Sequence, residues 1–288
     1  MYRQMDDKTK GIIEITIAAI LFGIIPLIVK LSSLSAYTLS SGRIIIATIF
    51  IGAWLGFKKK KIDSIKKDRV KFILFGVLHA LIILFSFIAI KTINVAIASI
   101  LIYAGAIYLV GLSAIFLKEK IERTTIFALF LCLIGFITLF WTNQFGGNLI
   151  GYLAGLLAGI FVAVVYLIGK ILSKNYDKKS MTFIQNLIAL PFVIPLFFME
   201  KFEINVINMT VLIFLGVFCT AVPFILLYSG MKKVKGQKAG LLLMLELIIP
   251  VVLSLLLLKE IPSYREWIGG GLILISYLIV GFSKSNEK

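Results

Sequence analysis

The sequence predicts an all-α integral membrane protein. Of its 288 residues, 60% are hydrophobic and 15% are charged, and the mean hydropathy is +1.04. A soluble domain cannot bury that much apolar surface. The apolar residues also form long unbroken runs, whereas a membrane β-barrel is built from short alternating segments.

Ten of these runs are long enough to cross a bilayer, because a hydrocarbon core of about 30 Å takes roughly 20 apolar residues in a helix. The first run has no small-residue cleavage site, so we interpret it as a retained helix. The connections are short and leave no room for an inserted soluble domain. The expected spans are 11–33, 37–57, 72–91, 94–117, 124–141, 149–169, 180–199, 208–230, 239–258 and 264–282.

The basic residues concentrate on one side of the predicted bundle. Of the 30 lysines and arginines, 24 fall in segments on the side of the two termini and five on the other side. The positive-inside rule then predicts cytoplasmic termini in a multi-pass protein of the cytoplasmic membrane. The run KKKKIDSIKKDRVK (58–71) is interpreted as a topology anchor that also meets anionic membrane lipid. Nucleic acid is not expected as a partner, despite the net charge of +16.

The chain is predicted to contain two related five-helix halves, 1–145 and 146–288. ASILIYAGAIYLVGLSAIFLKEKI (98–121) resembles AGLLLMLELIIPVVLSLLLLKEI (239–261). Because five is an odd number, the second half must enter the membrane in the opposite orientation. Inverted repeats of this kind recur in secondary transporters, where one half rocks against the other around a mid-membrane site.

Further pairs support the repeat. FGVLHALIILFSFIAIKTI (75–93) matches LGVFCTAVPFILLYSGMKKV (215–234), with Gly76 and Gly216 in corresponding places. LFGIIPLIVK (21–30) resembles VAVVYLIGK (162–170), and both end a helix at a lysine. The repeat therefore extends over most of each half.

These motifs, in this order, resemble the EamA-type permeases of the drug/metabolite transporter superfamily. In that family the fourth helix of each half reads like LLxxxEPxxxxLLAxLFLGE, and Glu246 and Glu260 have the spacing of its two glutamates. SGRIIIAT (41–48) resembles the arginine-bearing start of the second helix. The family proline after the first glutamate is replaced by Leu247, with a proline later at Pro250. The resemblance implies ten helices around a central cavity and export of amino acids or other metabolites.

Glu246 is the first candidate for the transport site. A charged group at a helix centre in a bilayer costs about 2.5–3.5 kcal/mol, so it persists where it faces a cavity or a partner. Glu246 lies near the middle of its span and shares a helix face with Pro250 and Ser254. We expect its carboxylate to bind a cationic group of the substrate or to carry a coupling proton. The alternative is a structural carboxylate bonded to a neighbouring helix.

Five further residues are candidates for binding substrate or protons. Arg43 could bind a substrate carboxylate, or it could anchor its helix within the protein. His79 could titrate near neutral pH, or it could be a hydrogen-bonded structural residue. Tyr103 is expected to line the cavity, and Tyr166 and Tyr228 are weaker candidates, because aromatic residues in helices more often pack.

Three prolines, Pro26, Pro223 and Pro250, are predicted helix kinks that could also act in gating. No metal site or cofactor is expected. Cys132 and Cys219 lie inside spans without metal or disulfide spacing, and His79 is the single histidine of the chain.

The sequence favours a secondary transporter that moves small organic metabolites, such as amino acids or similar amphipathic solutes, by alternating access, with export as the expected direction. An enzyme is not expected, because no zinc-protease motif, nucleophile elbow or phosphate-binding loop is present. The alternative is a lipid or lipid-carrier flippase, or an assembly subunit, of the same superfamily. The substrate, the coupling ion and the oligomeric state are left open.

Overall fold

The computed structural model describes residues 6–59, 62–93, 95–119, 122–140, 148–199, 205–253, 256 and 264–282. Every element within these residues is helical, which confirms the all-α prediction. The elements are α1 (Asp7–Gly23), α2 (Ile25–Leu31), α3 (Ala36–Phe57), η1 (Lys66–Asp68), α4 (Arg69–Thr92), α5 (Val95–Phe116), α6 (Arg123–Phe140), α7 (Leu149–Leu172), α8 (Lys178–Phe197), α9 (Val206–Gly216), η2 (Val217–Ala221), α10 (Val222–Lys233), α11 (Gly236–Leu243), η3 (Met244–Leu247), α12 (Ile248–Leu253) and α13 (Tyr264–Phe282).

Seven helical stretches of the described chain are long and apolar enough to cross a membrane: Asp7–Leu31, Ala36–Phe57, Lys66–Thr92, Ile97–Phe116, Leu149–Leu172, Lys178–Phe197 and Val206–Lys233. Two shorter apolar helices, Arg123–Gly135 and Trp267–Val280, lie within α6 and α13. The predicted span 239–258 begins on α11 and ends outside the described residues. A multi-pass membrane protein is therefore established, while the number of ten spans and the cytoplasmic termini remain predictions.

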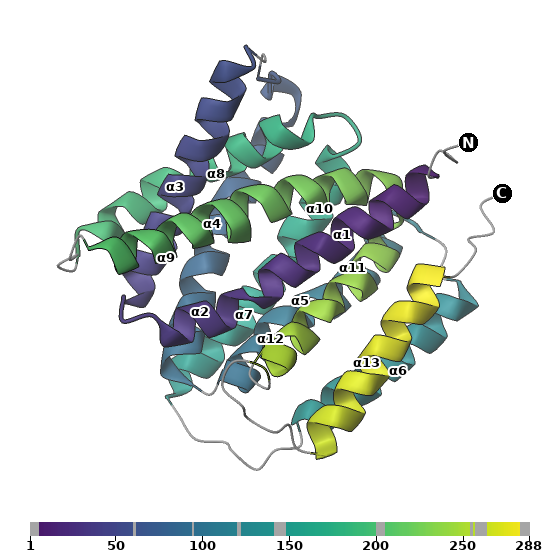
Figure 1. Ribbon diagram of the computed structural model, residues 1–288. Helices are drawn as coiled ribbons and strands as arrows, with labels where there is room; N and C mark the ends of the chain where they lie inside the picture. Colours follow the sequence, from purple (N-terminus) through teal and green to yellow (C-terminus); the bar gives the residue numbers. More distant parts are fainter. Residues whose placement is uncertain are drawn as a thin grey trace, which may run out of the picture.

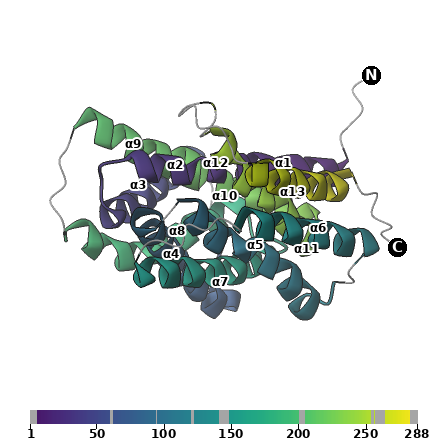
Figure 2. The same ribbon diagram turned by 90° about the horizontal axis from the view of Figure 1, so that it is seen from below.

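The helices pack as pairs that join distant parts of the chain. The helix α1 lies along α10, α3 along α8, and α7 along both α4 and α5. A second group, α6 with α13, lies at one edge of the bundle (Figure 1, Figure 2). The two chain ends lie at the same end of the molecule (Figure 1), which we call the termini end.

Three of the long helical stretches are broken, and each break lies beside a proline. The helix α1 ends at Gly23 and α2 restarts before Pro26. A π-helical turn, η2, separates α9 from α10 just before Pro223. A 3₁₀ turn, η3, separates α11 from α12 just before Pro250. Proline has no backbone N–H, so it leaves the carbonyl four residues earlier without its helical partner. The three predicted kinks therefore coincide with irregular backbone.

The closest helix–helix approach joins α5 to α7 through two glycines. A Cβ atom added to Gly159 would collide with the carbonyl oxygen of Leu101, and one added to Gly105 would collide with the carbonyl oxygen of Gly159. Small residues of this kind allow membrane helices to pack backbone to backbone. The α5–α7 contact positions Tyr103 of α5 and Tyr166 of α7 on the same side of the bundle.

Gly159→Ala is expected to lower the stability of the protein, because overpacking a close contact costs about 1–3 kcal/mol. Gly111→Ala on α5 is the matched control. Nothing lies within 4 Å of an added Cβ there, so it should leave stability unchanged or raise it slightly. The midpoint of thermal unfolding in detergent measures both. Equal midpoints for the two variants would contradict the close α5–α7 contact.

Candidate functional site

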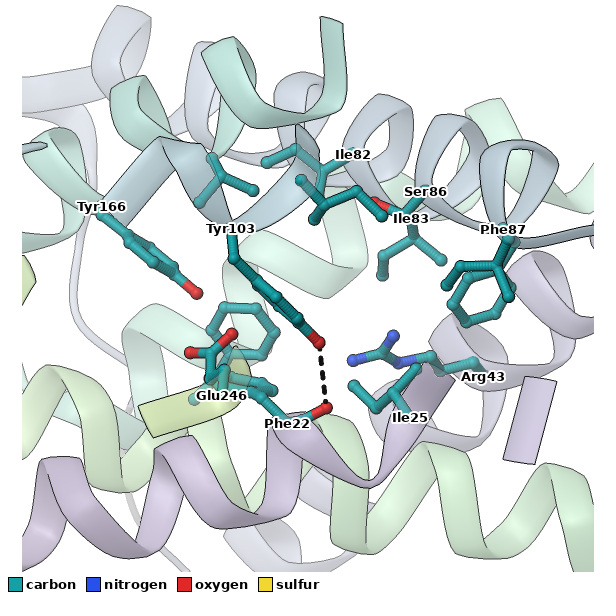
Figure 3. Close-up of a pocket in the computed structure, with 14 residues that line it drawn as sticks. Phe22, Ile25, Arg43, Ile82, Ile83, Ser86, Phe87, Tyr103, Tyr166 and Glu246 are labelled. Atoms are coloured by element: carbon teal, nitrogen blue, oxygen red, sulfur yellow. Dashed lines mark hydrogen bonds between the residues drawn. The ribbon is translucent and has the colours of Figure 1, made fainter. Parts of the chain in front are cut away.

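A cavity lies between the two broken segments of α1–α2 and α11–α12 and the helices that face them. It holds about 70 Å³ of space that the centre of a water molecule can reach, which is room for several waters or part of a small solute. Most of its wall is apolar or aromatic (Figure 3). The lining residues are Phe22, Ile25, Arg43, Ile82, Ile83, Ser86, Phe87, Ile90, Ile102, Tyr103, Val162, Tyr166, Phe224 and Glu246.

Glu246 brings an acidic group to this cavity. It lies in η3, is 3% exposed, and its Oε1 atom has no hydrogen-bond partner among the described residues. Pro250 cannot donate a hydrogen bond to the carbonyl of Glu246, and the chain around Glu246 takes the tighter 3₁₀ form. The carboxylate therefore sits at a helix break and faces the cavity, with acceptor capacity to spare (Figure 3).

Arg43 brings a cation to the same cavity. It lies in the first half of α3 and is 4% exposed. Its Nε atom donates to Oγ1 of Thr220, and Nη2 donates to the carbonyl oxygen of Cys219. Cys219 is the residue whose helical hydrogen bond Pro223 removes. The break at η2 thus supplies the acceptor that holds the guanidinium group in place.

Phe87 adds to this setting, because its ring centroid lies 5.6 Å from Cζ of Arg43, within the range of a cation–π contact. The π turn is itself stabilised by Thr220, whose hydroxyl donates to the carbonyl oxygen of Leu215 at 2.8 Å. A buried arginine is stable only when its donors are used, and two elements far apart in sequence meet that need here.

Tyr103 lies between the acidic and basic ends of the cavity (Figure 3). Its hydroxyl donates to the carbonyl oxygen of Phe22 in a long contact of 3.4 Å. Phe22 is the residue whose carbonyl Pro26 leaves unpaired. Tyr166 points its hydroxyl toward the side of Glu246 (Figure 3). The sequence candidates Glu246, Arg43, Tyr103 and Tyr166 are thus brought together.

His79 and Tyr228 are placed elsewhere. Both are fully buried, and neither lines the cavity. The His79 ring packs edge-to-face on Phe224, with centroids 4.8 Å apart, directly behind the cavity wall. The Tyr228 hydroxyl donates to Oε1 of Gln185 at 2.8 Å. For these two residues the structure supports the structural interpretation of the sequence more than the binding one.

The cavity is closed toward the termini end by aromatic rings. Phe224 of the cavity wall packs on Tyr228, with centroids 5.7 Å apart, and Tyr228 packs on Phe75 at 5.4 Å. Phe72 continues this series to Tyr176, at 5.0 Å. The lining residues of α4, in contrast, come from its last half, which lies away from the termini end.

Ion pairs lie beyond the aromatic rings at the termini end. Lys233 donates to Glu14 at 2.8 Å, which joins α10 to α1. Lys235 donates to Glu122 at 2.8 Å, and this hydrogen bond lowers the pKa of the Glu122 carboxyl. Glu119 accepts hydrogen bonds from the backbone N–H groups of Gly236 and Gln237, at the start of α11. The termini end is therefore the closed end.

The family model for the EamA-like transporter family matches the chain twice, at residues 9–141 and 149–282. The chain belongs to this family. The two matches leave only the ends and a short central segment uncovered, and together they support the transporter prediction.

The curated relatives of this EamA-like protein carry transporter names. An "Uncharacterized transporter" of Archaeoglobus fulgidus is 30% identical over 191 residues, or 66% of this chain and 68% of that protein. "Uncharacterized transporter YetK" of Bacillus subtilis is 27% identical over 56% of this chain and 52% of that protein. "Uncharacterized transporter YxxF" of the same organism is 21% identical over 91% and 86%.

A solved crystal structure has the same fold as this EamA-like protein. Its TM-score is 0.77, with 16% sequence identity, and the match covers 94% of this chain and 96% of that one. At this identity the likeness concerns the fold alone. The family membership therefore indicates transport and not enzymatic catalysis, whereas the roles of individual cavity residues rest on the geometry described above.

Sequence reasoning missed most of the lining residues of α4. Ser86 is the most informative of them, because it is 7% exposed and its Oγ atom has no partner among the described residues. Ile82, Ile83, Ser86, Phe87 and Ile90 recur at helical spacing and so share one face. That periodicity was the available signal, but in a span that is apolar all round it does not separate a cavity face from a packed one.

Thr220→Val is expected to destabilise the protein, because it leaves the Nε–H of Arg43 buried without an acceptor. An unsatisfied buried donor of this kind costs about 1–3 kcal/mol, and each kcal/mol lowers the unfolding midpoint by roughly 2–4 °C in a chain of this size. Thr138→Val is the control, since the Thr138 hydroxyl only bonds to the carbonyl of Ile134 in its own helix. Thermal unfolding in detergent compares the two. Equal midpoints would show that Arg43 does not depend on η2.

Proposed function

We propose that this EamA-like protein is a secondary transporter that moves small amphipathic organic solutes, such as amino acids, across the cytoplasmic membrane. The observation that carries the proposal is the cavity in which a buried acid and a buried base face an apolar and aromatic space. In the proposed topology, ten spans form two inverted halves, 1–145 and 146–288, with both termini in the cytoplasm. Export is the proposed direction, and alternating access the proposed mechanism.

The acidic end of the cavity favours a substrate with an ammonium or other cationic group. Glu246 is buried with a free acceptor atom, and an ionised carboxylate without a partner is unfavourable there. A cationic group of a substrate would remove that cost, and so would a proton. Both possibilities make Glu246 the residue that couples occupancy of the cavity to charge.

The basic end favours a substrate whose other pole accepts hydrogen bonds. Arg43 uses two of its donors on η2, and guanidinium groups carry five. Ser86, with its unpartnered Oγ, lies close to Arg43 along the cavity wall (Figure 3). A carboxylate or carbonyl of the substrate fits this end.

The apolar wall between the two ends selects for the rest of the substrate. Phe22, Ile83, Phe87 and Phe224 offer contact area but few hydrogen bonds. Sugars and polyanions would lose hydration without replacement there. Amphipathic solutes, with an apolar side group between polar ends, match the wall.

Glu246→Gln is expected to abolish substrate exchange, or to remove its dependence on a pH gradient, because the amide neither ionises nor attracts a cation. The measurement is counterflow in proteoliposomes with labelled amino acids, nucleosides and cationic drugs, with and without a pH gradient. Asp7→Asn is the matched control, since its carboxylate is 84% exposed at the start of α1. It should behave as wild type.

Unchanged exchange and unchanged pH dependence in Glu246→Gln would contradict the role given to the acid. If wild-type protein moves no solute of the panel but does move fluorescent lipid analogues, the flippase alternative replaces the solute transporter.

A further inference from the structure

A buried lysine fastens two helices at the termini end. Lys170 lies in the last turn of α7 and is 6% exposed. Its ammonium group donates to the carbonyl oxygens of Met231 and Val234, at the end of α10. The last carbonyls of a helix have no partners of their own and carry the negative end of the helix dipole. Lys170 therefore caps α10 and holds it against α7 beside the closed aromatic end.

The repeat gives Lys170 a counterpart at the other end of the molecule. LFGIIPLIVK (21–30) and VAVVYLIGK (162–170) both end at a lysine, so Lys30 corresponds to Lys170, 140 residues apart. Gly76 and Gly216 are separated by the same 140 residues, whereas Glu119 and Glu260 are separated by 141.

The extra residue is explained by η2. This π-helical turn at Val217–Ala221 lies in the second half, and a π turn accommodates one more residue than an α turn. Its counterpart region lies inside the unbroken helix α4. The separation of corresponding residues is thus 140 before η2 and 141 after it.

With that correction, the carbonyls corresponding to Met231 and Val234 belong to Ile90 and Ile93 at the end of α4. The local geometry agrees. Val234 caps α10 with φ −125° and ψ 158° and donates its N–H to Gly230. Ile93 caps α4 with φ −124° and ψ 177° and donates its N–H to Ala89. Both the caps and their acceptors are 141 residues apart.

The two lysines are in opposite states. Lys170 is buried and bonded, while Lys30 is exposed and its side chain makes no hydrogen bond or ion pair within the described part of the chain. At that end, Lys91 of α4 instead donates to the carbonyl of Ser32, just after α2. The α7–α10 fastening is made, and its counterpart between α2 and α4 is not.

We propose that Lys30 and Lys170 are alternating latches of the transport cycle. In the state described here Lys170 closes the termini end. In the opposite state Lys30 caps α4 through the carbonyls of Ile90 and Ile93, which closes the other end, and Lys170 releases α10. This inference rests on the proposed alternating access, because inverted halves exchange conformations when the protein changes the side to which it opens. Each latch stabilises one state, so removing it shifts the population to the other.

The test measures from which side the cavity can be reached. A cysteine replaces Ile82, which lines the cavity, in a chain whose buried Cys132 and Cys219 are changed to alanine. A membrane-impermeant maleimide is applied to sealed vesicles of either orientation. Loss of a hydrogen bond made by a charged group corresponds to about a tenfold change in the ratio of the two states.

Lys30→Met should raise labelling from the side away from the termini and lower it from the termini side. Lys170→Met should do the reverse, and the double variant should return toward wild type. Lys174→Met, at an exposed lysine just after α7, is the control and should leave labelling unchanged. If Lys170→Met does not fold, judged by its elution in size-exclusion chromatography, Lys30→Met decides alone, because Lys30 is exposed and unbonded here.

Unchanged labelling in Lys30→Met, with substrate exchange intact in wild type, would overturn the latch and leave the proposed function standing. Opposite shifts in the two lysine variants, with no solute moved by wild type, would support the latch while the proposed substrate class fails.

Discussion

A helix in a bilayer has to satisfy its own carbonyl groups, because the hydrocarbon offers no hydrogen bonds. The site depends on three places where this cannot happen. Pro26, Pro223 and Pro250 each remove one donor, and the carbonyls concerned belong to Phe22, Cys219 and Glu246. Phe22 and Glu246 line the cavity directly, and Cys219 does so through Arg43. The breaks that would weaken a packed helix therefore create the polar surface of an otherwise apolar cavity.

The same constraint explains why the acid and the base of the cavity do not neutralise each other. Arg43 is held by the π turn on one side, and the ring of Tyr103 lies between it and Glu246 (Figure 3). A direct ion pair would remove both charges from reach of a solute. Keeping them at separate ends costs desolvation energy, and a dipolar solute can recover that energy by binding. The unpartnered Oε1 of Glu246 is the clearest mark of this arrangement.

The fold was predictable to a large degree, because apolar runs of the right length have few alternatives in a membrane. Glu246, Arg43 and Tyr103 were also predictable, since ionisable or polar groups inside such runs need a reason to be there. Ser86 and Phe87 were not, because nothing in a uniformly apolar helix marks the face that a cavity will occupy. His79 shows the opposite difficulty. A titratable side chain indicates function in a sequence, yet its ring lies behind the wall, packed on Phe224.

The two halves differ most at η2, and this difference has a physical cause. The helix α4 of the first half runs without interruption, whereas the corresponding helix of the second half contains the extra residue of the π turn and Pro223. The turn exposes the carbonyl of Cys219 and the hydroxyl of Thr220 to Arg43. Gln185, near the position in α8 that corresponds to Arg43 in α3, is neutral and bonds to Tyr228 instead. One half therefore supplies the cation and the other its acceptors, so a nearly symmetric scaffold carries an asymmetric site.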